Sequence, residues 1–374
     1  MHKLKVGLIF GGRSGEHEVS LASAASVYNA LDKNKYEVTL IGIDQKGRWL
    51  LPKESIMLAN SANPMKIRLG EVEGSVALIP YSSSTQIVNT KPVAGTPSLN
   101  KLDVIIPILH GTYGEDGTLQ GLLQMADIPF VGSGVLGSAI GMDKDVARRL
   151  LKEAGIPVVP TSCFRKSDFK ANPQAVVDKI LKDFSFPFFV KPANAGSSVG
   201  VHKVKTKEQL LPALEDAFSF DLKVLVEKGV AARELECSVL GNDTPKASLV
   251  GEIIPHHEFY SYEAKYLDDD GMHYHIPAQD LKPGVAEQIQ AMAKKAFQVL
   301  ELRGMARVDF FLDKNTHELY LNEVNTIPGF TKISMYPKMW EASGLSYSNL
   351  LDELIRLALE QHQETAKLRT TYNR

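Results

Sequence analysis

The chain opens with a short apolar run that ends in glycines, and this pattern decides what its first third can fold into. Residues Lys5 to Phe10 predict a buried strand, and the glycine turn after them leads into apolar positions at helical spacing. Val38 to Ile43 and Leu102 to Leu109 predict two more buried strands. Such strands predict an open parallel α/β unit, and the irregular stretch Asp44 to Asn100 is expected to elaborate its sheet edge.

The remainder of the chain predicts α+β structure, in which hairpins alternate with helices. Phe186 to Lys191 is expected to pair with Val199 to Val204, and Met305 to Leu312 with Glu318 to Val324. An amphipathic helix is expected over Tyr347 to Gln361. At about 150 residues per domain, a chain of 374 residues is expected to form two or three domains.

Charge and cysteine content argue against several classes of function. The 42 Lys and Arg residues nearly balance 44 Asp and Glu residues, so the protein has no overall charge that attracts nucleic acid or an anionic membrane. A local basic patch on the surface is still compatible with this balance. The apolar run at the N-terminus is too short for a signal peptide, and nothing longer resembles a membrane span. Cys163 and Cys237 are too few for a disulfide framework or a zinc cluster. We therefore expect a cytoplasmic protein whose polyanionic ligands are small.

The turn Gly11 to Glu16 is the first candidate binding element. Its glycines let the backbone approach a ligand, and a helix N-terminus attracts negative charge. A dinucleotide fold requires G-x-G-x-x-G, of which the last two glycines are present while Phe10 takes the place of the first; Asp44 could then bind a ribose. Alternatively, the Glu16 carboxylate binds a substrate ammonium. A tight turn with a helix-capping acid explains the same residues without a ligand.

The loop His110 to Thr118 is the second candidate element. It follows the third predicted strand and so lies at the same sheet edge as the first turn, which is where open α/β sheets bind ligands. His110 could serve a ligand there or be an ordinary buried histidine with its hydrogen bonds satisfied.

The glycine and serine loop Lys191 to Gly200 is the third. No G-x-x-x-x-G-K-S/T occurs in the chain, and this loop joins two strands, so a P-loop nucleotide site is not expected. Backbone N–H groups and hydroxyls could still close over a polyphosphate while Lys191 supplies charge. A plain flexible hairpin is the alternative.

The fourth element is the predicted hairpin that carries Arg307, Asp309, Glu323 and Asn325. Strand alternation puts the first two side chains on one face of their strand and the last two on one face of the other. Three oxygen ligands could then share a face, which suits Mg²⁺. A solvated hairpin face is the alternative, and the apolar neighbours of these residues argue against it.

The polar segment His256 to Gln279 is too long for an ordinary loop in a compact protein. It carries five aromatic side chains, which argue against disorder. We expect it to act as a closing lid.

In this order and at these spacings, the motifs resemble those of the D-alanine–D-alanine ligases, members of the ATP-grasp superfamily. The resemblance runs from Gly11 to about Leu357 and includes Gly114-Glu115-Asp116-Gly117-Thr118-Leu119-Gln120-Gly121, Glu263-Ala264-Lys265-Tyr266 and Glu323-Val324-Asn325-Thr326. It implies an N-terminal open parallel-sheet domain followed by a two-part ATP-grasp fold. The implied units are a Rossmann-like substrate-binding domain (1–138), a central ATP-grasp subdomain (139–226) and a C-terminal ATP-grasp subdomain with the lid and metal site (227–374).

The resemblance also implies a role for each candidate residue. The implied catalytic residues are Glu16, Ser197, Tyr266, Arg307 and Gly329. Glu16 would hold the ammonium of the first D-alanine, with His110 nearby. Arg307 and the Gly329 N–H would stabilise the oxyanion, and Ser334 would bind the carboxylate of the second D-alanine. The implied ATP ligands are Lys144, Lys191 and Ser198, with Glu227 at the adenine amino group, Glu234 at the ribose and Lys265 at the transferred phosphoryl group. Tyr266 would form a hydrogen bond with Ser197. The implied ligands of Mg²⁺ (or Mn²⁺) are Asp309, Glu323 and Asn325.

The implied activity is ATP-dependent joining of two D-alanines through an acyl phosphate, with release of ADP and phosphate, for peptidoglycan precursor synthesis. A homodimer is also implied. A ligase that accepts D-lactate is the nearest alternative, although Tyr266 in its Glu-Ala-Lys-Tyr context resembles the dipeptide-forming type. A dinucleotide-binding oxidoreductase or a nucleotide sensor is the alternative from a different class.

Overall fold

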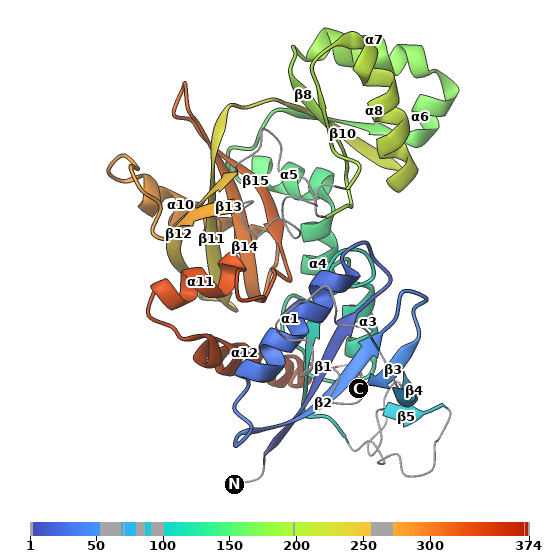
Figure 1. Cartoon of the computed structure of the whole chain (residues 1–374), viewed down its shortest axis with the longest axis vertical. Coiled ribbons are helices and arrows are strands. Elements are labelled where there is room, and N and C mark those ends of the chain that lie inside the picture. Colours follow the sequence, from blue (N-terminus) through green and yellow to red (C-terminus); the bar gives the residue numbers. More distant parts are fainter. Residues whose placement is uncertain are drawn as a thin grey trace.

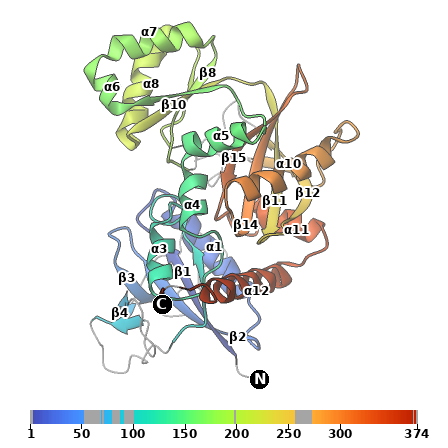
Figure 2. The ribbon, with the colours of Figure 1, turned by 180° about the vertical axis from the view of Figure 1, so that it is seen from behind.

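The computed structural model describes residues 3–52, 69, 72–79, 87–90, 101–196, 199–255, 272–369 and 371–372. The described strands form three sheets (Figure 1), and Figure 2 shows the same arrangement from behind. The predicted fold class is confirmed: a sheet with parallel strands comes first and two antiparallel sheets follow.

The first sheet has the strand order β5-β4-β3-β2-β1-β6. Its parallel strands are β1 (Leu4–Gly11), β2 (Tyr36–Ile43) and β6 (Val104–Ile108), and helix α1 (His17–Ala30) connects the first two. The predicted edge elaboration consists of antiparallel strands β3 (Trp49–Pro52), β4 (Val72–Leu78) and β5 (Ile87–Asn89). The sheet is therefore mixed, with its parallel part placing the ends of β1 and β6 side by side.

The second sheet is antiparallel and lies beyond three connecting helices. The helices are α3 (Thr118–Met125), α4 (Val135–Met142) and α5 (Lys144–Glu153). The sheet order is β7 (Thr161–Arg165), β10 (Lys223–Lys228), β8 (Phe188–Pro192) and β9 (His202–Val204). Helices α6 (Lys166–Ala171), α7 (Pro173–Asp183) and α8 (Lys207–Phe220) lie beside it in Figures 1 and 2. The predicted hairpin is confirmed as β8 and β9.

The third sheet is also antiparallel. Its order is β13 (Met272–His275), β12 (Lys246–Pro255), β11 (Ala232–Gly241), β14 (Gly304–Asp313) and β15 (Leu319–Asn325). Helices α10 (Val285–Val299) and α11 (Met335–Ala342) pack against it. The second predicted hairpin is confirmed as β14 and β15, whose register sets Arg307 opposite Asn325 and Asp309 opposite Glu323.

The last helix, α12 (Tyr347–Ala366), returns to the first sheet. It packs against α1 and β6, and its apolar face shares one core with the face of the first sheet that carries α1. Asp352 on this helix accepts hydrogen bonds from Lys35 Nζ at 2.6 Å and from the Tyr36 hydroxyl at 2.7 Å. The last helix of the chain therefore packs against its first sheet. The predicted domain boundaries after residues 138 and 226 stay predictions.

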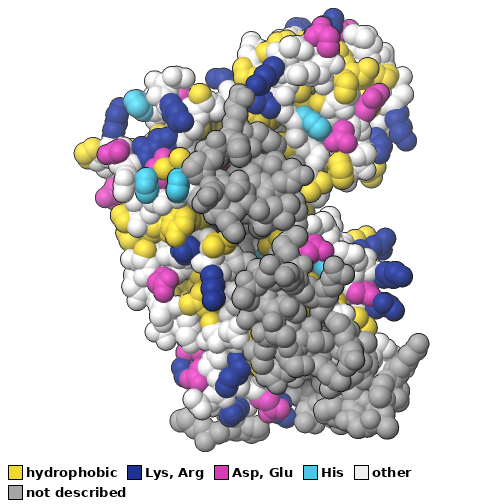
Figure 3. Space-filling view, viewed as in Figure 1, with side chains coloured by type: hydrophobic (Ala, Val, Ile, Leu, Met, Phe, Trp, Pro, Cys, Tyr) yellow, Lys and Arg dark blue, Asp and Glu magenta, His cyan; other side chains and the backbone are white. Residues whose placement is uncertain are grey.

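The surface agrees with the balanced composition. On the face in Figure 3, the described Lys and Arg side chains are interspersed with Asp and Glu side chains and form no single patch of one charge. Within the described ranges, no helix is long and apolar enough to cross a membrane.

Candidate active site

Three loops converge on the carboxylate of Glu16. The Glu16 backbone N–H donates to Ser14 Oγ at 3.2 Å, and that hydroxyl donates to the carbonyl oxygen of His110 at 2.8 Å. A Cβ atom added to Gly111 would lie 2.9 Å from Glu16 Oε2, and one added to Gly196 would lie 2.5 Å from it. The glycines therefore leave the space that this carboxylate occupies. Glu16 is the N-cap residue of α1, but its side chain makes no capping hydrogen bond, which argues against the helix-capping explanation.

The structure argues against Asp44 as the ribose ligand of a dinucleotide site. Asp44 Oδ1 accepts hydrogen bonds from the backbone N–H groups of Lys46 and Arg48, and its Oδ2 accepts one from Arg48 Nε at 2.7 Å. These bonds close the turn between β2 and β3. The oxygens of the Asp44 side chain are therefore already bonded within the turn.

His110 is buried and both ring nitrogens are bonded. Nδ1 lies 3.0 Å from the carbonyl oxygen of Ile327, which can only accept, so Nδ1 carries the proton. Nε2 then accepts from Ser23 Oγ at 3.3 Å, and Ser23 Oγ accepts from the backbone N–H of Phe330 at 3.2 Å. Burial lowers the pKa of His110, against the opposing charge of Glu16. The neutral histidine thus positions the segment around Gly329.

Glu115 is a site residue that the motif reading did not assign to a role. Its Oε2 accepts from the Gly111 N–H at 2.8 Å and its Oε1 from the Ile327 N–H at 3.0 Å. Burial, and then the charge of Glu16, raise the pKa of Glu115 to about 8. One side chain therefore links the loop after β6 to the segment after β15.

Lys191 and Glu227 meet in a buried cluster with Arg148. Lys191 Nζ lies 2.6 Å from Glu227 Oε2, and Arg148 Nη1 lies 2.5 Å from the same oxygen. Burial lowers the pKa of Lys191 to about 8, although Glu227 opposes this. Burial also opposes the charge of Glu227, yet Arg148 and Lys191 lower its pKa. Arg148 was not among the predicted residues.

Lys144 connects the glycine loop with the predicted metal hairpin. Its Nζ donates to the carbonyl oxygen of Ala195 at 2.8 Å and lies 3.5 Å from Glu323 Oε2. Its backbone N–H donates to Ala193. The structure thus brings together the predicted phosphate and metal ligands Lys144 and Glu323. Glu234 lies on β11, where its register partner is Phe311.

The hairpin of β14 and β15 is not a solvated face. Arg307 donates from Nε to Asp309 Oδ1 at 2.8 Å and from Nη2 to Oδ2 at 2.7 Å, and its Nε lies 3.1 Å from Glu236 Oε2. Although burial opposes its charge, Asp309 and Glu236 raise the pKa of Arg307 above its usual range. Glu236 is a second residue that the motifs did not indicate.

The oxygen donors of this hairpin fit Mg²⁺. Asn325 Nδ2 donates to Asp309 Oδ2 at 3.0 Å, and Glu323 is the register partner of Asp309 on the other strand. Two carboxylates and an amide oxygen are hard ligands that leave positions for substrate phosphates. Among the described residues, no group of three or more His, Cys, Asp and Glu side chains could hold a metal ion. Phosphate oxygens of a nucleotide would supply further ligands.

Gly329 and Ser334 lie in contact at the start of α11. A Cβ atom on Gly329 would fall 2.7 Å from Ser334 Oγ, which accepts from the Thr331 N–H at 3.0 Å. The other predicted residues, Ser197, Ser198, Lys265 and Tyr266, lie outside the described residues, as do positions 256–271 of the predicted lid.

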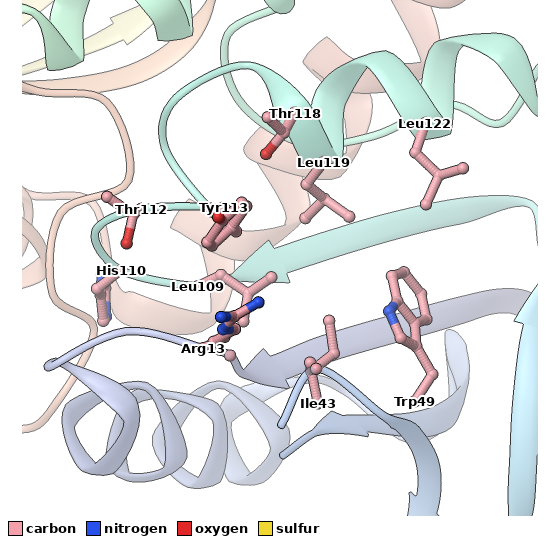
Figure 4. A pocket seen from close by; sticks show the side chains of 13 residues that line it. Arg13, Ile43, Trp49, Leu109, His110, Thr112, Tyr113, Thr118, Leu119 and Leu122 are labelled. Carbon is pink, nitrogen blue, oxygen red and sulfur yellow. The ribbon is translucent and has the colours of Figure 1, made fainter. Parts of the chain in front are cut away.

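A cavity of about 280 Å³ opens beside the loop that follows β6. Figure 4 shows Ile43, Trp49 and Leu119 around it, with Arg13 near Tyr113 at one side. The Arg13 guanidinium lies 5.8 Å from the centre of the Tyr113 ring. Of the predicted site residues that the structure describes, His110 alone lines this cavity.

Comparison with known proteins shows similarity along nearly the whole chain. A family model described as the D-Ala D-Ala ligase N-terminus matches residues 5–133, and one described as the D-Ala D-Ala ligase C-terminus matches residues 150–356. The chain is 51% identical over 369 residues to the D-alanine–D-alanine ligase of Oceanobacillus iheyensis, covering 99% of each. It is 48% identical over 371 residues to D-alanine–D-alanine ligase A of Escherichia coli, covering 99% of this chain and 100% of the relative.

Solved structures agree with these relatives. The D-alanine–D-alanine ligase from Coxiella burnetii superposes with a TM-score of 0.82 at 39% identity, covering 98% of this chain and 97% of that one. The VanG D-Ala:D-Ser ligase from Enterococcus faecalis superposes with a TM-score of 0.80 at 35% identity, covering 96% of this chain and 100% of that one.

Proposed function

Because the chain belongs to the D-alanine–D-alanine ligase family, we propose that the residues around Glu16, Lys191 and Arg307 carry out the ligation of two D-alanines. The protein has D-alanine–D-alanine ligase activity and serves peptidoglycan synthesis. The observation that most strongly supports the site is the approach of the Glu16 carboxylate to Gly196, since it sets an ammonium-binding group beside the loop assigned to phosphate.

In the first half-reaction, Glu16 binds the ammonium of the first D-alanine, whose carboxylate attacks the γ-phosphoryl group of ATP. Lys144 and Lys191 hold the phosphates, and ADP leaves. Phosphoryl transfer requires mainly positioning and charge neutralisation. Asp309, Glu323 and the Asn325 side-chain oxygen would hold Mg²⁺, which supplies part of that neutralisation when bound. Lys265 is proposed to reach the transferred group.

In the second half-reaction, the amine of the second D-alanine attacks the acyl phosphate. Arg307 and the Gly329 N–H stabilise the tetrahedral oxyanion, phosphate leaves, and the amide bond is complete. Ser334 binds the carboxylate of the second D-alanine. The attacking amine must lose a proton, for which Tyr266 and the departing phosphate are the candidates. The lid is proposed to protect the acyl phosphate from water.

The deciding experiment measures ADP release and product mass with ATP and D-alanine, with D-lactate or D-serine then added in competition. The expected product is D-alanyl-D-alanine, and its formation should persist in the mixtures at neutral pH. Preferential formation of D-alanyl-D-lactate, or of the D-serine dipeptide, would reject the substrate assignment. Tight NADH binding that Mg·ATP does not affect would instead favour the oxidoreductase alternative.

Two further expectations from the resemblance stay predictions. A homodimer is tested by light scattering of the purified chain. A cytoplasmic location is tested by fractionation of the cells that make the protein.

We predict that Gly196→Ala weakens D-alanine binding without unfolding the protein. The new methyl group would lie 2.5 Å from Glu16 Oε2 and push the carboxylate out of position. We expect the KM for the first D-alanine to rise about tenfold, a loss of ~1.4 kcal/mol. Gly134→Ala is the matched control, because a Cβ atom at Gly134 meets nothing within 4 Å. An unchanged KM in Gly196→Ala would contradict the proposed position of the ammonium.

We predict that ADP binding weakens above pH 8. The ammonium of Lys191 binds phosphate, and with its pKa lowered to about 8 the ligand-free protein loses this charge as the pH rises through that value. Below pH 8 the affinity should be flat, and above it the Kd for ADP should rise up to tenfold per pH unit. Calorimetric titration between pH 7 and 9.5 measures this, with Lys191→Gln as a control that should bind weakly at every pH. A flat profile in the unmodified protein would remove Lys191 from the phosphate site.

A further inference from the structure

We propose that Arg148 is a positioning residue that selects adenine over 6-oxopurines by fixing the Glu227 carboxylate. The proposal rests on the proposed function, in which Glu227 faces the adenine amino group. It concerns a residue that no motif indicated and that lies on α5, a helix otherwise represented in the site by Lys144.

Arg148 is held in place from two strands. Its Nη1 donates to Thr161 Oγ1 on β7 at 2.5 Å, and its Nη2 donates to the Asn322 carbonyl oxygen on β15 at 3.2 Å. The residue is only 5% exposed. A planar guanidinium anchored at both ends has little freedom to turn, so whatever it binds is fixed with it.

Both cations of the cluster use the same oxygen of Glu227. Arg148 Nη1 and Lys191 Nζ lie 2.5 and 2.6 Å from Oε2. Within the described part of the chain, no side chain or backbone group is bonded to Oε1. Glu227 is 3% exposed, and its second oxygen is left to accept a hydrogen bond from a ligand.

The chemistry of that oxygen discriminates between purine bases. An ionised carboxylate only accepts hydrogen bonds, so Oε1 suits the 6-amino group of adenine and repels the 6-oxo group of hypoxanthine or guanine. Arg148 and Lys191 keep Glu227 ionised despite its burial. Lys191 is also assigned to the phosphates, which leaves Arg148 as the cation dedicated to Glu227.

The charge balance of the cluster supports this division. Two cations around one carboxylate leave a net positive charge of one in a buried place, which a triphosphate would neutralise. If Arg148 were only a packing residue, its loss would weaken all nucleotides equally. If it positions Glu227, its loss should weaken the choice between bases.

The test compares ATP with inosine triphosphate, which differs at position 6 of the base. In the unmodified protein we expect a strong preference for ATP in kcat/KM, because a buried polar group rejects a ligand that leaves it unpaired. In Arg148→Met we expect this preference to fall at least about tenfold. The loss should appear mainly in the KM for ATP, with kcat changed only a few-fold. Binding of ADP and inosine diphosphate should show the same change in ratio.

Two variants keep the test decisive. Thr161→Val removes one anchor of Arg148 at nearly constant volume and should lower the ATP preference by a smaller factor; it decides the question if Arg148→Met does not fold. Arg149→Met is the control, because Arg149 is 67% exposed and pairs with Asp145 on the helix surface, and it should keep the preference.

The outcomes separate the two proposals. No ADP release from the unmodified protein with D-alanine and ATP would refute the proposed function itself. Normal ligation together with an unchanged base preference in Arg148→Met, or in Thr161→Val if Arg148→Met is unfolded, would overturn the role of Arg148 alone.

Discussion

Asp309→Asn is expected to lower ATP-dependent turnover by about 10²–10³-fold at every Mg²⁺ concentration. The substitution keeps the size of the side chain but removes the charge that two groups depend on. Arg307 would lose its two-bonded carboxylate partner, and the predicted metal site would lose one of its two anionic ligands. Arg307 would keep Glu236 at 3.1 Å, so the hairpin should stay folded.

The measurement is ADP release as a function of Mg²⁺, with thermal unfolding followed in parallel. Asp313→Asn is the matched control: it makes the same change at the end of the same strand, where Asp313 Oδ1 accepts from the backbone of Asn315 and Thr316 in a turn. The control should retain most of the activity. Asp309→Asn with ordinary Mg²⁺ activation would exclude that residue from the metal site.

The placement of this hairpin was predictable because strand alternation is a strong local rule. Residues two apart on a strand share a face, so the spacing of Arg307 and Asp309 determined their side, and the short turn determined their partners. The sequence around Asp44 to Asn100 offered no such rule. Three short antiparallel strands lie there, with too few alternating residues to show their register.

The residues missed by sequence reasoning act through long-range contacts. Glu115 reaches Ile327 across 212 positions, and Arg148 reaches Asn322 across 174. Local patterns do not encode such pairs. One signal was present for Arg148: it lies beside Ala147 and three residues before Leu151, on the apolar stripe of its helix. A charged residue on a buried stripe requires a partner, which indicates an ion pair without naming it.

His110 lies in a family motif, but its bonds in the structure are those of a buried structural residue. The motif reading left open whether this residue serves a ligand or is a satisfied buried histidine. The geometry favours the second description, because both ring nitrogens are bonded within the protein. Its bonds nevertheless end on Ile327 and, through Ser23, on Phe330, which flank Gly329. A buried histidine thus supports the segment of the proposed oxyanion site, and its place near the first D-alanine stays a prediction.

Glu16→Gln is expected to reduce kcat/KM for the first D-alanine by about 10²–10³-fold while leaving ADP binding unchanged. Truncating one partner of a desolvated charge pair costs about 2–5 kcal/mol, since the ammonium would be left without a counterion. Glutamine keeps the shape that fits between Gly111 and Gly196, so the loops should not collapse. The effect therefore separates charge from packing, which Gly196→Ala cannot do.

Kinetics with D-alanine and calorimetry with ADP measure the two halves of this prediction. Glu18→Gln is the matched control on the same helix, where Glu18 accepts a hydrogen bond from Gln45 at 3.3 Å, and it should behave as the unmodified protein. A second readout comes from Glu115, whose pKa of about 8 reflects burial first and the charge of Glu16 next. Without that charge its pKa should fall, so any pH dependence of the residual activity near pH 8 should move to lower pH. Equal loss of D-alanine and ADP binding would mean that Glu16 holds the site together instead of binding the ammonium.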